Sequence, residues 1–181
     1  MSRNIILWLK IAILTIFLIL IDQFTKYMAV VRLKAQNDVI LIKNVLRLHY
    51  LDGGNTGAAW GLLSGKIILF VVFTIIAMIF IILFIYNTQR IILNTDIKST
   101  VLPLKILNCA FVFLLSGAAG NLIDRIVHGY VIDFIYFELI NFPIFNVADC
   151  YVTIACAVIV IICFFKVKEN EFNQIFSLKR K

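Results

Sequence analysis

Long apolar stretches that carry almost no charge constrain this chain more than any other feature. The stretch from Ile67 to Tyr86 contains no charged residue, and its roughly twenty positions allow a helix to cross a bilayer core of about 30 Å. Of the 181 residues, 62% are hydrophobic and only 15% are charged, whereas a soluble domain is only about half apolar. We therefore predict an α-helical membrane protein with four transmembrane helices, at about residues 5–31, 66–86, 101–123 and 145–165.

The net charge of +7 comes from basic residues that flank the predicted spans. This placement favours a role in topology over nucleic-acid binding, with attraction to anionic lipid as a secondary effect. If both termini are cytoplasmic, the inner segments hold ten Lys or Arg residues and the outer segments hold seven. We therefore predict an N-in, C-in topology with residues 35–65 and 126–145 outside. Asp22-Gln23 follows the first apolar run without a small-residue cleavage site, which predicts that this run is retained as a membrane helix.

The cysteine and histidine residues do not suggest a metal or redox site. Cys109, Cys150, Cys156 and Cys163 lie in apolar runs and form no C-x-x-C pair, which is typical of cysteine used as a small hydrophobe. The two histidines lack the helical spacing of a metal-binding pair. We therefore expect neither a disulfide framework nor a zinc site.

Between residues 38 and 62 the pattern changes to the β-branched and partly alternating VILIKNVLRLHYL, followed by the glycine-rich DGGNTGAAWG. This pattern is typical of strands. Because open sheet edges cannot face lipid, we predict a small extracytoplasmic β-sheet on the membrane surface. A short amphipathic surface segment rich in aromatic residues is predicted at about 134–144, interrupted by Pro143. The chain shows no internal repeat, and we interpret residues 1–181 as a single domain.

Five acidic or amide residues lie within or beside the apolar runs: Asp22, Asn121, Asp124, Asp133 and Asp149. Ionisable groups are costly to place in a membrane, so residues of this kind are candidates for function. The small residues 116–120, which precede Asn121, permit close contact between membrane helices.

Two of these acids share a helical face with a basic residue. Asp22 and Lys26 are spaced i and i+4, so they form either an ordinary ion pair at a helix end or one wall of a site. Asn121, Asp124 and Arg125 also share one face. The forked donors of Arg125 suit a carboxylate or a carbonyl oxygen.

Asp133 in VIDF and Asp149 in FNVAD form a spaced pair of carboxylates. Two carboxylates in a partly apolar site come to share a proton. One of them can then accept a proton from water while the other polarises a peptide carbonyl. The spacing alone leaves open whether the two acids meet or whether each is a structural hydrogen-bonding group.

Five sequence blocks resemble, in order, the signature blocks of the lipoprotein signal peptidase (signal peptidase II) family: DQFTK at 22–26, NTGAAWG at 55–61, GAAGNLIDR at 117–125, VIDF at 131–134 and FNVAD at 145–149. The resemblance covers roughly residues 10–165. It implies a four-helix aspartic peptidase of the bacterial inner membrane that needs no metal or cofactor. Such an enzyme removes the signal peptide of a prolipoprotein just before a diacylglyceryl-modified cysteine.

The same resemblance assigns the catalytic dyad to Asp133 and Asp149, and not to Asp124 of the GNxxDR block. The positions that it implies shape or hydrogen-bond the site are Asp22, Lys26, Asn55, Gly57, Asn121, Asp124, Arg125 and Asn146. Trp60 departs from the family pattern, in which phenylalanine is usual. The linker between the two catalytic positions is also slightly shorter than in many members of the family.

The resemblance further implies prolipoprotein substrates, inhibition by globomycin-type cyclic peptides, a monomer in contact with membrane lipid, and a site that faces the extracytoplasmic side. Two functions of other classes remain as alternatives from the residues alone. One is a small transporter or proton relay, which would need polar residues deep in several spans. The other is a non-enzymatic lipid-binding or assembly subunit, which would not need paired aspartates.

Overall fold

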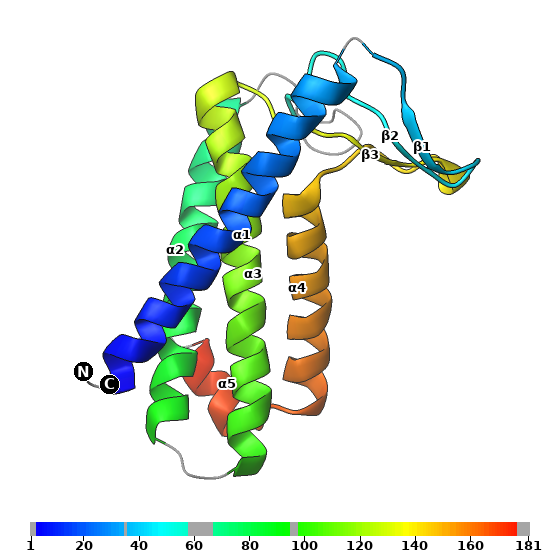
Figure 1. Cartoon of the computed structure of the whole chain (residues 1–181). Helices are drawn as coiled ribbons and strands as arrows, with labels where there is room; N and C mark the ends of the chain where they lie inside the picture. The colour runs from blue at the N-terminus through cyan, green and yellow to red at the C-terminus, as the bar shows by residue number, and fades with distance from the viewer. Residues whose placement is uncertain (1–2, 35, 58–66, 95–97, 177–181) are drawn as a thin grey trace.

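Four long helices form the body of the protein, and a small sheet projects from one end of them (Figure 1). The computed structural model describes residues 3–34, 36–57, 67–94 and 98–176. The helices are α1 (Arg3–Leu33), α2 (Ile67–Asn94), α3 (Lys98–His128), α4 (Val147–Phe165) and the short α5 (Glu169–Ile175). Residues 58–66, which include Trp60, the end of the NTGAAWG block and the predicted start of the second span, lie outside the described residues.

The four long helices are each long and apolar enough to cross a membrane, and the predicted fold class is confirmed. Three of them extend beyond the apolar runs from which they were predicted. At the end of the bundle that carries the sheet, the longest extension belongs to α3, which continues to His128. This extra length keeps Asp124 and Arg125 on a rigid helix.

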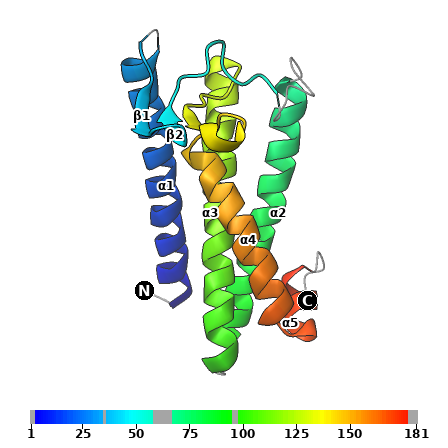
Figure 2. The same ribbon diagram turned by 90° about the vertical axis from the view of Figure 1, so that its right-hand side faces the viewer.

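Helix α3 is the centre of the bundle. Figure 2 shows it between α1 and α2, with α4 crossing in front, and α3 contacts all three of these helices. In the most apolar window of α3, 44% of the residues are buried, against 6% in α1 and in α2. The remaining faces of α1, α2 and α4 are exposed and apolar, which suits contact with lipid.

Glycines on α3 allow its neighbours to approach closely. A Cβ atom at Gly117 would lie 2.6 Å from the backbone oxygen of Ala148 in α4, and one at Gly120 would collide with the carboxylate of Asp22 in α1. The prediction that the small-residue run permits tight helix contact is therefore confirmed. This close approach brings α1, α3 and α4 together at the end of the bundle that carries the sheet.

Helix α2 continues past its predicted end at residue 86 and remains helical to Asn94, at the end of the bundle farthest from the sheet. Its polar residues are helical because they have partners there. The hydroxyl of Thr88 donates to the Phe84 oxygen at 2.8 Å, and the side chain of Asn87 donates to the Ile175 oxygen of α5 at 2.8 Å. Ile175 is fully buried, so α5 packs against the end of the bundle farthest from the sheet.

The sheet has three antiparallel strands in the order β1 (Val39–Ile42), β2 (Leu46–Leu48) and β3 (Ile135–Phe137). The third strand comes from the predicted surface segment, which forms β3 and a 3-10 turn, η2 (Glu138–Ile140). That segment is extended because its backbone pairs with β2, with Arg47 opposite Tyr136. Further backbone hydrogen bonds tie it to Phe145, just before α4.

Candidate active site

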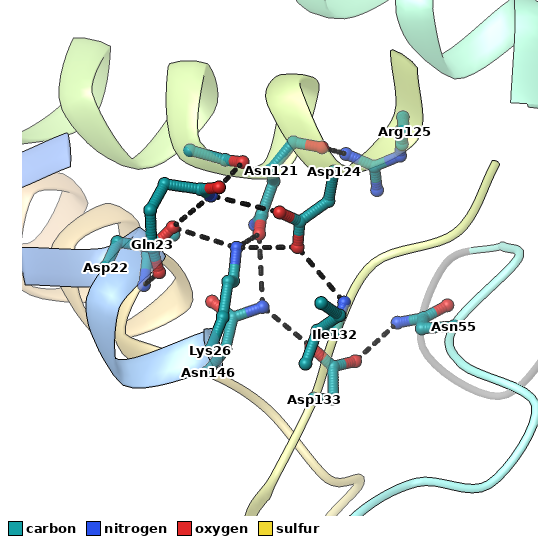
Figure 3. Close-up of polar contacts among 12 residues, drawn as sticks. Asp22, Gln23, Lys26, Asn55, Asn121, Asp124, Arg125, Ile132, Asp133 and Asn146 are labelled. Carbon is teal, nitrogen blue, oxygen red and sulfur yellow. Dashed lines mark hydrogen bonds and ion pairs between the residues drawn. The ribbon is translucent and has the colours of Figure 1, made fainter. Parts of the chain in front are cut away.

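Asp133 and Asp149 lie at the end of the bundle that carries the sheet and belong to one hydrogen-bonded network, part of which is shown in Figure 3. Asp133 lies in the extended segment between α3 and β3, and Asp149 lies in the first turn of α4. Asn146 links them, because its side chain donates to Asp133 at 2.6 Å and its backbone N–H donates to Asp149 at 3.1 Å. The structure thus brings together the two acids that sequence spacing left unconnected.

Asp133 is held by two amide side chains and is almost fully buried. Nδ2 of Asn146 donates to one carboxylate oxygen, and Nδ2 of Asn55 donates to the other at 2.9 Å. Burial raises the pKa of Asp133 to about 7, and the charge of Asp149 adds to this increase. The two amide hydrogen bonds and the charge of Lys26 act in the opposite direction and lower the pKa of Asp133.

Asp149 is fixed by the start of its own helix. Asn146 is the N-cap of α4, and its side-chain oxygen accepts the backbone N–H of Asp149 at 3.0 Å. The Asp149 carboxylate in turn accepts the backbone N–H of Asn146, which completes a capping box. Its other oxygen accepts Nδ2 of Asn121 at 2.8 Å. A helix N-terminus and an amide donor therefore orient this carboxylate.

Lys26 lies between two carboxylates beneath the dyad. Its Nζ is 2.9 Å from Asp22 and 2.9 Å from Asp124, and all three side chains are buried. The same Nζ donates to the Asn121 oxygen at 2.9 Å. Lys26 therefore forms three charge-assisted contacts, which is what a buried ammonium group requires. We refer to Asp22, Lys26 and Asp124 as the ionic triad.

The ionic triad also holds the backbone on either side of the dyad. The Asp22 carboxylate accepts the backbone N–H of Ala148, the residue before Asp149, at 2.9 Å. The Asp124 carboxylate accepts the backbone N–H of Ile132, the residue before Asp133, at 3.1 Å. One buried cation thus ties together the two segments that carry the paired acids.

The loop that supplies Asn55 is locked to the Asp133 segment. Asn55 and Val131 exchange both backbone hydrogen bonds at 2.9 Å, and the Leu51 N–H donates to the backbone oxygen of Asp133 at 3.1 Å. The Asn55 side-chain oxygen accepts the N–H of Gly57 at 3.0 Å. Gly54, at a φ of +67°, lies so close to the Tyr130 ring that a Cβ atom would overlap it.

The side chain of Arg125 points away from that of Asp124, the residue before it. Its guanidinium lies over the Phe70 ring, 5.2 Å from the centroid, and donates weakly to the Asn121 backbone oxygen at 3.4 Å. Asp124 faces Lys26 instead. The face shared by Asn121, Asp124 and Arg125 is therefore divided between the ionic triad and an open pocket.

That pocket has a volume of about 1160 Å³ and runs from Asp149 and Arg125 towards the sheet. Cys150, Thr153 and Ile154 of α4 form its wall on the membrane side. At its far end Arg47 pairs with Asp38 at 3.1 Å and lies over the Tyr136 ring. The pocket therefore has polar groups at both ends and is large enough for a peptide segment with a bulky substituent.

Sequence reasoning missed two parts of this region. Gln23 donates to Asp124 at 3.0 Å and to the Gly120 oxygen at 3.2 Å, and its only signal was its place inside the DQFTK block. The pocket wall formed by Arg47 and Tyr136 depends on the pairing of β2 with β3, which the sequence did not predict. Within the described ranges, no group of three or more His, Cys, Asp or Glu side chains is arranged to hold a metal ion.

Comparison with known proteins gives consistent matches over most of the chain. The family model described as signal peptidase (SPase) II matches residues 14–165. A lipoprotein signal peptidase from Enterococcus faecalis is 37% identical over 91% of this chain and 89% of its own length. The lipoprotein signal peptidase from Clostridium tetani is 34% identical over 88% of this chain and 94% of its own length. The one from Halothermothrix orenii is 33% identical over 82% of this chain and 91% of its own length. A solved structure of a bacterial membrane enzyme superposes with a TM-score of 0.70 and 32% identity, covering 88% of this chain and 92% of that one.

Proposed function

Since this chain belongs to the signal peptidase II family, whose members are aspartic peptidases that remove signal peptides from prolipoproteins, we propose that Asp133 and Asp149 are its catalytic dyad. The observation that carries the proposal is the linkage of the buried Asp133 carboxylate to the partly buried Asp149 carboxylate through one residue, Asn146. Membership of the family decides against a transporter or an assembly subunit.

In this proposal the two carboxylates share one proton, because two charges so close together in a buried site cannot both persist. The ionised acid accepts a proton from water as the water oxygen attacks the scissile carbonyl carbon. The protonated acid gives its proton to the carbonyl oxygen. Collapse of the tetrahedral intermediate then breaks the C–N bond, and a proton returns to the leaving amine. The products are a free signal peptide and a new amino terminus.

We further propose that the substrate carries a diacylglyceryl group on the cysteine after the cleaved bond. The α4 wall of the pocket, with Thr153 and Ile154, faces the level at which lipid chains would lie, so the lipid can remain in the bilayer during cleavage. Arg125 and Asn55 line the pocket and are placed to hydrogen-bond an unwound peptide backbone, while Gly57 shapes the loop beside them. Asn121 supports the site from behind by donating to Asp149.

The proposed setting is the bacterial inner membrane, with an N-in, C-in topology and the pocket on the extracytoplasmic side. The positive-inside count supports this orientation. We also propose that residues 1–181 act as one peptidase domain, as a monomer, and that globomycin-type cyclic peptides inhibit it by occupying the pocket.

The test of the proposed function is cleavage of a synthetic prolipoprotein by the purified protein in detergent. The matched control peptide has the same sequence with an unmodified cysteine. We expect cleavage of the lipidated peptide, with mass spectrometry placing the cut immediately before the cysteine. Equal cleavage of both peptides, or a cut elsewhere, would contradict the proposed substrate.

The pKa of Asp133 predicts how cleavage depends on pH. Because this pKa is raised to about 7, the pair keeps its shared proton below that pH and loses it above, so kcat should fall on the alkaline side of about 7. Burial of the neutral acid contributes to stability at low pH, and this contribution is lost as the pH rises through the same value. Asn55→Ala removes a hydrogen bond that lowers the pKa of Asp133, and should therefore move the alkaline limb to higher pH. A limb that did not move would argue that Asp133 does not carry the proton.

Arg125→Lys should lower turnover more than the retained charge suggests. Lysine keeps the cation at the pocket but loses the planar fork that can hold two acceptors and stack on Phe70. Loss of one charge-assisted hydrogen bond costs about 1.5–3 kcal/mol, which corresponds to roughly a tenfold to hundredfold lower rate. The measurement is turnover in detergent after thermal unfolding shows that the variant is folded. Arg32→Lys, at an exposed position near the end of α1, is the matched control. If Arg125→Lys showed wild-type turnover, Arg125 would serve only as an anchor at the membrane interface.

A further inference from the structure

The end of the sheet farthest from the bundle carries an apolar surface that the proposed mechanism does not use. We call this surface the apolar tip, and its members are Ile40, Leu41, Ile42, Leu139 and Ile140. Each of these side chains is more than half exposed. Isolated exposed hydrophobic residues are ordinary, but a contiguous group of this size marks a binding surface.

The two parts of the apolar tip belong to one surface. The Leu139 N–H donates to the oxygen of Val45 in the turn that joins β1 to β2, at 3.4 Å. The Val45 N–H in turn donates to the Ile42 oxygen at 3.0 Å. Figure 1 accordingly shows η2 against the far end of the sheet.

Exposure of the apolar tip to water would be unfavourable, because it combines apolar side chains with an unpaired strand edge. Strand β1 pairs only with β2 among the described strands, so its other edge presents unpaired backbone groups. A free edge with the sequence VILI would invite pairing with other chains if it faced water. A surface that is always present in the cell must therefore cover the tip.

The position of the tip identifies that surface as the bilayer. Helix α4 has 19 residues, or about 28 Å at 1.5 Å per residue, which matches a hydrocarbon core of about 30 Å. The start of α4 at Val147 therefore marks the outer boundary of the core. Figure 1 shows the sheet projecting sideways at about this height, beyond the edge of the bundle.

The backbone and charges of the tip limit how deeply it can insert. The unpaired backbone groups of β1 cannot enter the hydrocarbon core, but side chains at the acyl boundary leave them among hydrated headgroups. Lys43, exposed in the turn beside Ile42, suits the level of lipid phosphates. Nearby Glu138 and Asp38 do not oppose this placement, because both pair with Arg47.

We propose that the apolar tip inserts into the headgroup–acyl boundary of the outer leaflet and anchors the sheet there. Phe142 and Pro143, which follow η2 after one residue, line the pocket. The anchored tip therefore holds the mouth of the pocket against the membrane surface where a lipidated peptide lies. The proposal rests on the extracytoplasmic orientation given above, but its test does not depend on cleavage.

The test places single tryptophans on the tip and measures their depth. In a full-length chain carrying Trp8→Phe and Trp60→Phe, Ile42→Trp and Ile140→Trp are reconstituted into vesicles of phosphatidylcholine and phosphatidylglycerol. Lipids brominated near the headgroup should quench both fluorophores more than lipids brominated near the chain ends. Asn37→Trp, exposed in the same segment but outside the tip, is the matched control and should be quenched much less.

Two results would overturn the proposal. One is the absence of quenching at residues 42 and 140. The other is fluorescence that depends on the protein-to-lipid ratio, which would show that a second copy covers the tip. A second test measures enzyme kinetics in a variant that carries no introduced tryptophan. Ile42→Ser with Ile140→Ser should raise KM several-fold in vesicles while leaving kcat, and KM in detergent, near wild type; an unchanged KM in vesicles would also contradict anchoring.

Discussion

Asp133→Asn and Asp149→Asn are each expected to abolish cleavage of a lipidated prolipoprotein, with a fall in kcat of about 10⁴-fold or more. A positioned proton-transfer group contributes about 10²–10⁴-fold, and the two acids act as one unit whose shared proton no amide can carry. The network adds a second reason. Both carboxylate oxygens of Asp133 accept side-chain amide N–H groups, from Asn55 and Asn146. In Asp133→Asn the new side-chain NH₂ group would therefore face one of these NH₂ groups, and no hydrogen bond could form between the two donors.

This second effect makes a folding control necessary. Each variant should be compared with wild type by thermal unfolding and by its retention in the membrane fraction. Asp52→Asn is the matched substitution, because Asp52 is an exposed carboxylate in the turn before Gly54 and should leave turnover near wild type. Substantial cleavage by a folded Asp133 or Asp149 variant would remove that residue from the dyad.

The membrane spans could be predicted from the sequence because they depend on local composition. An uncharged run such as Ile67 to Tyr86 is long enough to cross a bilayer whatever the rest of the chain does. The ends of the helices depend on tertiary contacts, and there the prediction was less successful. Helix α2 continues through Asn87 and Thr88 because α5 and the helix backbone supply their partners.

The candidate site shows the same division between local and long-range information. Helical spacing showed that Asp22 and Lys26 share a face, and the structure pairs them. Spacing left open whether this pair is an ordinary helix-end bridge, because the third member, Asp124, lies 98 residues further along the chain than Lys26. For the same reason the role of Gln23 and the contribution of β3 to the sheet could not be read from periodicity.

The resemblance to the signal peptidase II family named the acids, but the structure supplies a reason for the residues around them. Asp22 and Asp124 each bind the backbone N–H immediately before one of the paired aspartates. Asn121 joins Lys26 to Asp149, and Asn146 joins Asp149 to Asp133. The position of the dyad therefore depends on a continuous polar network that begins at the ionic triad.

Lys26→Met should consequently damage both stability and catalysis. Methionine fills much of the space of the lysine stem but leaves the carboxylates of Asp22 and Asp124 buried without their cation. Removal of one partner of a buried ion pair costs about 3–5 kcal/mol, so the free energy of unfolding should fall by about that amount. Lys10→Met, at an exposed position of the same helix, should change it little. An Lys26→Met protein as stable as wild type would show that the triad is not the anchor of this network.

A triple variant separates the two effects of Lys26. Adding Asp22→Asn and Asp124→Asn removes the uncompensated charges while keeping a side-chain oxygen for the N–H groups of Ala148 and Ile132. The triple variant should therefore be more stable than Lys26→Met alone, since neutral replacement of a buried ion pair is often tolerated. Its dyad would still lack the charge that lowers the pKa of Asp133, so the alkaline limb of its residual activity should lie at higher pH than in wild type. Recovery of stability without that shift would mean that Lys26 holds the backbone of the site but does not influence its proton.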